Sequence, residues 1–297
     1  MIVKSPSFEY ETGYGRLIVA CSSALKGFKH GNLLVADPSN IERSAFRFTM
    51  WETTELPLER RQFNTDVIIV PCEHNRKLFR KYTRKPIEVC PLFGSGTFSH
   101  LPSARPFRFI CIARENGVPA RKGIKELVSW FTEAFPTQPD VSLTIKQSPS
   151  CAERYTYDKR IVFIREDFNH AKYQELLTAH HCGIFLSGAE AWNFPASELM
   201  ATGRPSILIP FGGPADFTTT KTSWHLPYKL VDAPQEVYRG IGKVAFPDKR
   251  GTIQAMREAY SDQLLLAEKA IASAKASHEY TEARFAQRLR SIVNRYG

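Results

Sequence analysis

The chain has 297 residues, of which 43% are hydrophobic and 24% charged, and it carries a formal net charge of +10. This balance is typical of a globular protein, and the length makes two domains the first expectation. No stretch approaches the roughly 18 apolar residues of a membrane span, and residues 1–6 lack the apolar core of a secretory signal. We therefore expect a cytoplasmic protein whose positive charge suits an anionic partner.

Short apolar runs that predict strands alternate with amphipathic segments along the chain. The predicted strands are residues 32–36, 66–70, 87–90, 109–113, 141–146, 161–164, 183–186 and 206–209. Residues 124–131 have apolar side chains at helical spacing, and the tail from about residue 263 is also predicted to be helical. This alternation indicates an α/β fold with parallel sheets and helices on both faces.

A polar, proline-bearing stretch, residues 99–106, lies between two predicted strands and is the best candidate linker. We place a domain boundary there, with an N-terminal domain of residues 1–104 and a C-terminal domain of residues 105–297. The tail has an apolar stripe of Phe285, Leu289 and Ile292. We expect that last helix to pack back on the first domain.

Two glycine pairs could bring the backbone close to a ligand. Gly13 and Gly15 precede a predicted helix, and a glycine permits close approach because it has no side chain. The third glycine of a dinucleotide-binding fingerprint is absent, so this motif alone identifies no ligand. Gly212 and Gly213 form a second pair, which fits either a loop that closes on a ligand or a simple turn.

An aromatic residue and an acid, Trp51 and Glu52, follow an apolar run in the first domain. One interpretation is a partly buried tryptophan beside a helix cap. The other is a part of the site that binds an acceptor substrate. The residue types do not separate the two.

Residues 76–85 hold six basic side chains and no acid: Arg76, Lys77, Arg80, Lys81, Arg84 and Lys85. We expect a helix with Leu78, Phe79 and Tyr82 facing inward and the cations facing outward. Such a face is either merely solvated or a docking surface for a polyanion. Nucleic acid and an acidic membrane both fit the second interpretation.

Three cations, Arg114, Arg121 and Lys122, lie in the segment between the strand 109–113 and the helix 124–131. Cations at the end of a parallel strand and beside a helix N-terminus make an anion site. A diphosphate is the obvious occupant. The alternative is a solvated loop, because arginine and lysine are common in loops.

Two carboxylates, Glu190 and Glu198, lie eight positions apart after the strand 183–186. We expect Pro195 to be the first residue of a short helix, with Glu198 in its first turn and Gly203 at its end. A carboxylate accepts hydrogen bonds from the two hydroxyls of a vicinal diol, such as a ribose or a hexose. The alternative is a pair of ordinary surface acids.

Several signatures of metal or covalent chemistry are absent. The six cysteines include no Cys-x-x-Cys pair, and there is no Asp-x-Asp or P-loop sequence. His180 and His181 are adjacent, so their rings do not chelate one ion easily. We therefore expect no metal site and no cofactor, and phosphate charge would be balanced by protein cations and helix dipoles.

Together these motifs resemble the retaining nucleotide-sugar glycosyltransferases of family 4, in a bacterial and phage-like subset. That resemblance implies the GT-B fold, in which two Rossmann-like domains face a cleft. The matching segments are the glycine loop 13–15, the Trp-Glu-Thr segment 50–57, Arg121-Lys122-Gly123, and Glu190 with Glu198 as the family's E-x7-E element. The family usually has glycine at Ala191 and Asn193, and asparagine tolerates a left-handed backbone better than most residues.

The resemblance also implies roles for individual residues. Glu190, Arg121 and Lys122 would be catalytic, and Trp51 and Glu52 would belong to the acceptor site. The residues implied to bind the donor are Gly13, Gly15, Arg114, Trp192, Asn193, Phe194 and Glu198. Glu198 would bind the ribose hydroxyls, and Glu190 would lie beside the donor sugar.

The expected activity is metal-independent transfer of a hexose, with retention, from a nucleotide-diphosphate sugar to an acceptor hydroxyl. A UDP-sugar, for example UDP-glucose, is the favoured donor. We expect the acceptor to be a hydroxymethylated base in phage-type DNA, because of the net charge and the basic segment 76–85. The alternatives are a lipid-linked or lipopolysaccharide acceptor at an anionic membrane, and a non-catalytic relative that binds a sugar nucleotide or a polyanion.

Overall fold

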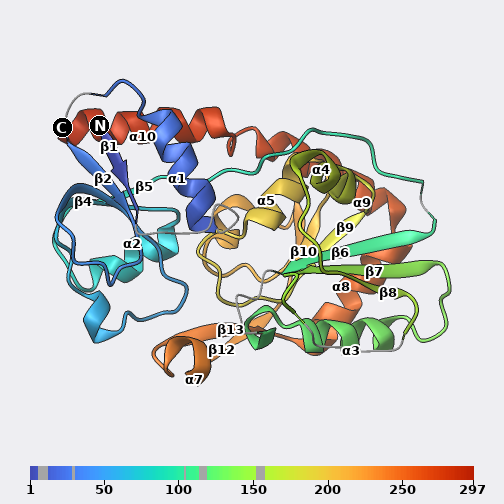
Figure 1. Ribbon diagram of the computed structural model, residues 1–297. Helices are drawn as coiled ribbons and strands as arrows, with labels where there is room; N and C mark the ends of the chain where they lie inside the picture. The colour runs from blue at the N-terminus through green and yellow to red at the C-terminus, as the bar shows by residue number, and fades with distance from the viewer. Residues whose placement is uncertain (6–12, 29–30, 104, 114–118, 152–157) are drawn as a thin grey trace.

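The computed structural model describes residues 1–5, 13–28, 31–103, 105–113, 119–151 and 158–297, which form two parallel sheets flanked by helices (Figure 1). The strands are β1 Ile2–Lys4, β2 Asn32–Val35, β3 Ser44–Phe48, β4 Thr65–Val70, β5 Ile87–Val89, β6 Phe107–Ala113, β7 Val141–Gln147, β8 Ile161–Ile164, β9 Cys182–Phe185, β10 Ser206–Leu208, β11 Ser223–His225, β12 Tyr228–Asp232 and β13 Lys243–Pro247. The helices are α1 Gly13–Ala24, η1 Leu58–Arg60, α2 Glu73–Arg80, η2 Pro119–Lys122, α3 Ile124–Ala134, α4 His170–Thr178, α5 Phe194–Ala201, α6 Pro214–Phe217, α7 Gln235–Tyr238, α8 Lys249–Ser261, α9 Gln263–Ser277 and α10 Glu282–Tyr296.

The first sheet is parallel, with its described strands in the order β1-β2-β3-β4-β5. Alternate side chains of β4 enter different cores, as the two-residue period of a strand requires. Val67 and Ile69 pack with α1 and α10, whereas Ile68 and Val70 pack with α2. Helices therefore cover both faces, as the alternating pattern of the sequence predicts.

The second sheet is also parallel, and its described strands run in the order β11-β10-β9-β6-β7-β8. Of the strands in this sheet β6 comes first along the chain, and it lies in the middle. β7 and β8 extend the sheet on one side, and β9, β10 and β11 extend it on the other. This is the doubly wound order of a dinucleotide-binding fold. The winding reverses between β6 and β9, and open α/β sheets bind their ligands at such a switch point.

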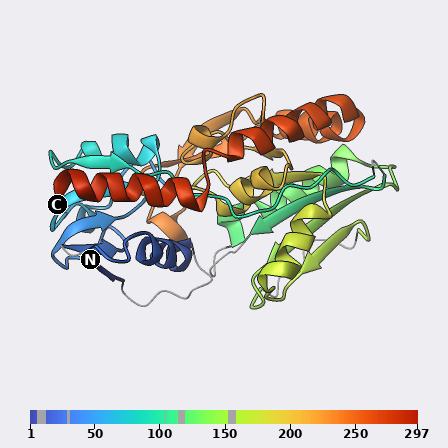
Figure 2. The ribbon, with the colours of Figure 1, turned by 90° about the horizontal axis from the view of Figure 1, so that it is seen from above.

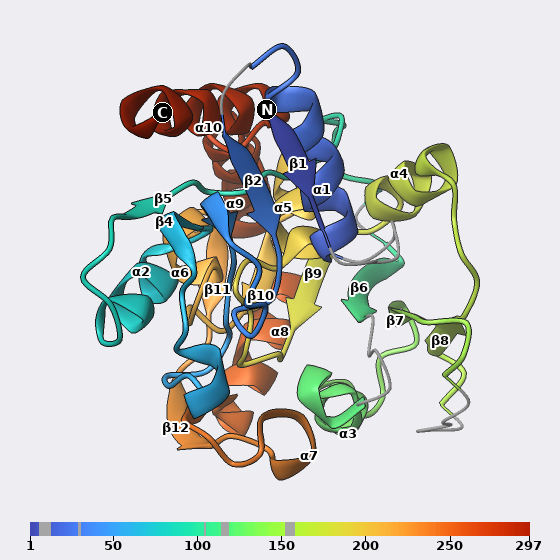
Figure 3. The same ribbon diagram turned by 60° about the vertical axis from the view of Figure 1, so that its left-hand side comes forward.

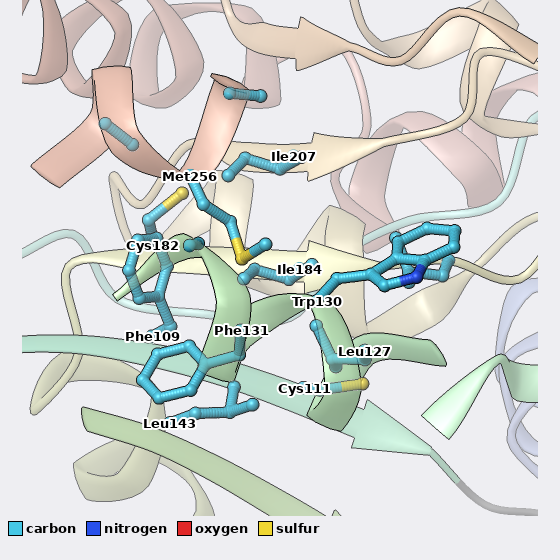
Figure 4. Packing of buried hydrophobic residues seen from close by; sticks show 14 of the residues in the cluster. Phe109, Cys111, Leu127, Trp130, Phe131, Leu143, Cys182, Ile184, Ile207 and Met256 are labelled. Carbon is cyan, nitrogen blue, oxygen red and sulfur yellow. The ribbon is translucent and has the colours of Figure 1, made fainter. Parts of the chain in front are cut away.

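One apolar core holds the second sheet against α3 and α8 (Figure 4). Leu127 and Phe131 of α3 come from the stripe that the sequence predicts to face inward, and both are fully buried. Met256 of α8 packs in the same cluster with Ile184 and Ile207 of the sheet. This packing fixes the strand ends that form the site described below.

The last helix, α10, runs along α1 beside the first sheet (Figure 2). Phe285 packs against Phe48 of β3 with ring centroids 6.2 Å apart. The Arg290 Nε donates to the Ala24 carbonyl oxygen at 2.7 Å. The division of the chain between residues 104 and 105 stays a prediction, which limited proteolysis can test.

The antiparallel hairpin of β12 and β13 reaches the loop that follows β3 (Figure 3). The Thr54 amide donates to the Lys243 carbonyl oxygen at 3.1 Å, and Tyr238 meets Trp51 edge to face at 5.6 Å. The hairpin therefore joins the two halves of the chain at a second place. The sequence pattern did not predict it.

Two predicted helices differ from those in the structure. The helix expected over residues 76–85 ends at Arg80, so the last three cations of the segment follow the helix. The residue before Pro86 is disfavoured in a helix, which is consistent with an early end. The helical tail is divided into α9 and α10, and the Thr281 side chain caps α10 by accepting from the Arg284 amide.

Candidate functional site

The ends of β6 and β9 bring two sequence-predicted charges together. After η2 the chain turns into α3 at Gly123, whose φ of +65° is left-handed. A Cβ at this position would lie 2.9 Å from the Leu186 Cβ, so a glycine lets η2 approach the end of β9. This close approach places Lys122 beside the loop that carries Glu190.

Lys122 and Glu190 form an ion pair in which the Lys122 Nζ donates to the Glu190 Oε1. Both side chains are largely buried, with 13% and 11% of their surface exposed. A charge-assisted hydrogen bond gains strength where water is scarce. The predicted anion-binding cation and the predicted diol-binding acid are therefore direct neighbours.

Arg121 connects this pair to the first half of the chain. Its guanidinium donates to the Ala189 carbonyl oxygen at 3.0 Å, which fixes it beside the Glu190 loop. The same guanidinium lies 4.0 Å from the Glu52 Oε1. We refer to Glu52, Arg121, Lys122 and Glu190 as the charge quartet.

The pKa shifts in the quartet follow from burial and from these neighbours. Burial alone would raise the pKa of Glu190, but the positive charges of Lys122 and Arg121 hold it below its ordinary value. Burial raises the pKa of Glu52, and the positive charge of Arg121 only partly opposes this effect. Burial and the repulsion of Arg121 lower the pKa of Lys122. Such shifts are common at functional sites.

Glu198 lies on α5, and its side chain is only 3% exposed. Its two carboxylate oxygens already accept hydrogen bonds within the protein. Oε1 forms an ion pair with Arg16 of α1, and Oε2 accepts from the Tyr173 hydroxyl at 2.7 Å. The predicted ribose anchor therefore has an arginine from the other half of the chain beside it.

The start of α5 differs by one residue from the prediction. Phe194 is the first helical residue and Pro195 the second, so Glu198 lies beyond the first turn. The reason is the cap: Asn193 has a left-handed φ of 78°, and its side chain accepts from the Ala196 amide. Asn193 thus has the left-handed backbone that asparagine tolerates better than most residues.

Trp192 and Phe194, on either side of Asn193, have different surroundings. The Trp192 ring is buried, packs on Phe217 at 4.7 Å, and donates its indole N–H to the Ser197 Oγ. Phe194 is partly buried and lies against the Arg16 guanidinium, whose carbon is 5.7 Å from its ring centroid. A role of Trp192 in donor binding would therefore fall to its backbone.

The second glycine pair supports the Glu190 loop. The Gly213 amide donates to the Glu190 carbonyl oxygen at 2.9 Å. Gly212 has a φ of +71°, and a Cβ there would lie 2.1 Å from the same oxygen. These glycines hold the backbone of the loop.

Of the remaining residues predicted to bind the donor, the structure describes Gly13 and Gly15. Gly13 and Gly15 are the first and third residues of α1, so this glycine pair lies in the first turn of the helix and not, as we expected from the sequence, before it. Arg114 lies outside the described residues. Arg16 and Tyr173 were not predicted as site residues, and the only available signal was the position of Arg16 directly after the glycine loop.

The predicted acceptor residues have different environments. Trp51 is buried, and its indole N–H donates to the Thr53 Oγ1 and the Glu55 carbonyl oxygen. Arg60 lies over its ring at 4.4 Å. Glu52 belongs to the charge quartet. Glu52 therefore faces the candidate site, whereas the Trp51 ring stabilises the loop.

The basic segment 76–85 adjoins this loop. Lys81, the residue after α2, donates to the Thr54 carbonyl oxygen at 3.0 Å. Arg76 pairs with Glu73, Arg80 donates to the carbonyl oxygens of residues 83 and 85, and Lys85 donates to that of Thr65. Of these cations Lys81 is thus held to the loop, Arg80 and Lys85 are held to backbone elsewhere, and Arg76 remains half exposed.

The described residues contain neither a candidate metal centre nor a membrane-spanning helix. No group of three or more histidine, cysteine, aspartate or glutamate side chains in this part of the chain could hold a metal ion. Within the same residues, no helix combines the length and apolar character needed to cross a membrane.

Comparison with solved structures identifies the fold. The chain is similar to the pneumococcal O-GlcNAc transferase GtfA in complex with UDP and GlcNAc (14% identity, TM-score 0.64) over 89% of this chain and 57% of GtfA. It is also similar to an S. aureus TarM mutant in complex with fondaparinux, α-GlcNAc-glycerol and UDP (13%, TM-score 0.67), over 92% of this chain and 58% of TarM. A third similar structure is the sucrose-phosphate synthase of Thermosynechococcus elongatus (13%, TM-score 0.67), over 97% of this chain and 80% of the synthase.

These likenesses show that the chain has the GT-B fold of two Rossmann-like domains, as the resemblance in the sequence implied. The chain spans less than two thirds of the length of GtfA and of TarM. No model of a known protein family matches it, and no curated protein matches its sequence. Membership of family 4, and of its bacterial and phage-like subset, stays a prediction.

Proposed function

We propose that this protein is a glycosyltransferase that takes its sugar from a nucleotide-diphosphate sugar. The observation that carries the proposal is the Lys122–Glu190 ion pair at the switch point of the second sheet. A sugar diphosphate has an anionic half and a polyhydroxyl half. The cations Arg121 and Lys122 suit the diphosphate, and the carboxylate of Glu190 suits the sugar hydroxyls.

The quartet also suits the chemical step. The bond between the sugar C1 and the diphosphate oxygen breaks, and a bond between C1 and the acceptor oxygen forms. The acceptor proton passes to the departing diphosphate. Arg121 and Lys122 stabilise the negative charge that develops on the diphosphate, which is electrostatic catalysis by fixed groups.

The nucleotide and the stereochemistry belong to the same proposal. The titles of the GtfA and TarM structures name UDP, which favours a UDP-sugar as the donor. In the proposed complex Glu198 binds the ribose. Retention at C1 and independence of a metal follow from the family resemblance, and we keep the cytoplasm as the proposed compartment.

For the acceptor we favour a hydroxymethylated base in DNA. The net charge of +10 and the six cations of the segment 76–85, of which Lys81 contacts the loop that carries Glu52, favour a polyanion. A base inside a duplex would have to leave the stack to reach the quartet. Duplex binding should then weaken by about three orders of magnitude between roughly 50 and 200 mM salt.

The test is a screen of UDP-sugars against acceptors, read by mass spectrometry and by release of free UDP. The acceptors are hydroxymethylated DNA, unmodified DNA and a lipid-linked glycan in anionic vesicles. The control variants are Lys122→Met and, on the exposed side of the same helix region, Lys125→Met. Transfer that is lost only with Lys122→Met supports the proposal.

The other outcomes separate the alternatives. Transfer to the lipid-linked glycan alone would show that the acceptor is this glycan and not DNA. UDP-sugar binding with no release of UDP under any condition would indicate a non-catalytic binder. A protein that neither binds a UDP-sugar nor releases UDP would contradict the proposal.

A further inference from the structure

The positive charge of Arg16 lies at an unfavourable position in its own helix. It is the fourth residue of α1, in the first turn, where the helix dipole disfavours a positive charge. The second half of the chain provides favourable contacts for it. The guanidinium pairs with Glu198, and its carbon lies 5.9 Å and 5.7 Å from the ring centroids of Tyr173 and Phe194.

The two members of the ion pair differ in their freedom to move. The Glu198 side chain is 3% exposed and is held by the Tyr173 hydroxyl. Burial raises the pKa of Tyr173 well above its usual range, so this hydroxyl stays a proton donor. The Arg16 side chain is 39% exposed. Arg16 is therefore the member that can leave.

From this geometry we infer that Arg16 forms a substrate-displaced link between the two halves of the protein. Without nucleotide, Arg16 holds α1 against α5 by occupying the Glu198 carboxylate. The two hydroxyls of a ribose need the same carboxylate, so a bound nucleotide exchanges the arginine for its own hydroxyls. The inference rests on the proposed function, because it takes Glu198 to be the ribose anchor.

If this link exists, it should lower the affinity of the protein for the nucleotide. A ligand that binds only the unlinked state has its apparent affinity reduced by the fraction of protein in that state. Removing Arg16 should therefore tighten nucleotide binding, by roughly tenfold if about a tenth of the protein is unlinked. A residue that binds the nucleotide would show the opposite effect.

Two variants that break the same ion pair test the inference. Arg16→Met removes the competitor, and Glu198→Gln removes the proposed ribose anchor. Hydrogen exchange without nucleotide should become faster in α1 and α5 of both variants. In calorimetric titration with UDP, Arg16→Met should bind several-fold more tightly than the unmodified protein and Glu198→Gln more weakly. Lys26→Met, an exposed charge change just beyond α1, should alter neither measurement.

Other results would overturn the inference. Unchanged exchange in Arg16→Met would show that the link does not hold the two halves, and weaker UDP binding by this variant would show that Arg16 binds the nucleotide. If no variant binds UDP, the proposed function fails. Faster exchange would then support the contact between α1 and α5, and the exchange of arginine for ribose would be refuted.

Discussion

The Glu52 carboxylate, from the loop after β3, lies 4.0 Å from the guanidinium of Arg121, a residue of η2. The first half of the chain supplies the carboxylate of this contact, and the second half supplies the guanidinium. Together with the Lys122–Glu190 pair, this contact brings two cations and two carboxylates together where the two halves of the chain face each other. The charge quartet therefore depends on both sheets, and each of its members can be tested separately.

Replacing Glu190 by glutamine should lower turnover about 100-fold, the usual loss when one fixed polar group beside a reacting centre is removed. The change keeps the shape of the side chain and removes the negative charge that pairs with Lys122 and that would, in the proposed complex, accept hydrogen bonds from sugar hydroxyls. Initial rates of UDP release at several donor concentrations measure the effect. Glu175→Gln, at an exposed position of α4, is the matched control and should keep full activity.

The Lys122–Glu190 pair should show strong coupling in stability. Lys122→Met leaves the Glu190 carboxylate buried without its lysine, and breaking a buried pair in this way costs about 3 kcal/mol. The double variant with Glu190→Gln removes both charges and should be more stable than Lys122→Met alone. Urea denaturation of the four proteins gives the coupling energy. Strictly additive losses would show that the two side chains do not interact.

Glu52→Gln should stabilise the protein near neutral pH. Because burial raises the pKa of Glu52, the folded chain keeps this proton to a higher pH than the unfolded chain. Stability is therefore lost as pH rises from the unfolded to the folded pKa, and the glutamine variant avoids that loss. The gain in Tm should vanish below the ordinary glutamate pKa of about 4.3. Glu55→Gln, at an exposed position of the same loop, should show no such pH-dependent gain.

Asp216 should stabilise α2 from the other half of the chain. The Asp216 Oδ2 accepts from the Glu73 amide at 2.7 Å, and Cys72, the residue before α2, provides no side-chain cap. Asp216→Ala should lower the free energy of unfolding by about 1 kcal/mol, as the loss of a helix cap does. Asp216→Asn keeps an acceptor oxygen and should lose less. Equal losses in both variants would mean that the carboxylate does not act as a cap.

Much of the second sheet could be predicted because β8, β9 and β10 lie in short apolar runs, as buried parallel strands usually do, and because β7 alternates apolar and polar residues. The meeting of Lys122 and Glu190 follows from the same pattern, since both residues come after neighbouring strands. β3 escaped prediction because its run is interrupted by Arg47, which is fully buried. β12 lacks a regular burial pattern because most of its residues are exposed.

The contacts between the two halves could not be predicted from local pattern. Arg16 and Glu198 lie 182 positions apart, and no periodicity connects them. The same holds for Tyr238, whose ring meets Trp51 because the β12–β13 hairpin returns to the first half. The sequence therefore identifies residues that suit a sugar diphosphate, and the fold shows that Arg16 lies beside one of them, Glu198.

The most direct test of the proposed donor site is the affinity for UDP of three proteins: the unmodified chain, Lys122→Met and Lys125→Met. Loss of one charge-assisted hydrogen bond to the diphosphate costs about 1.5–3 kcal/mol, which corresponds to a tenfold to hundredfold increase in Kd. We expect this increase for Lys122→Met and an unchanged Kd for Lys125→Met. Equal affinities of all three proteins for UDP, or no binding by the unmodified chain, would contradict the assignment of the charge quartet as a donor site.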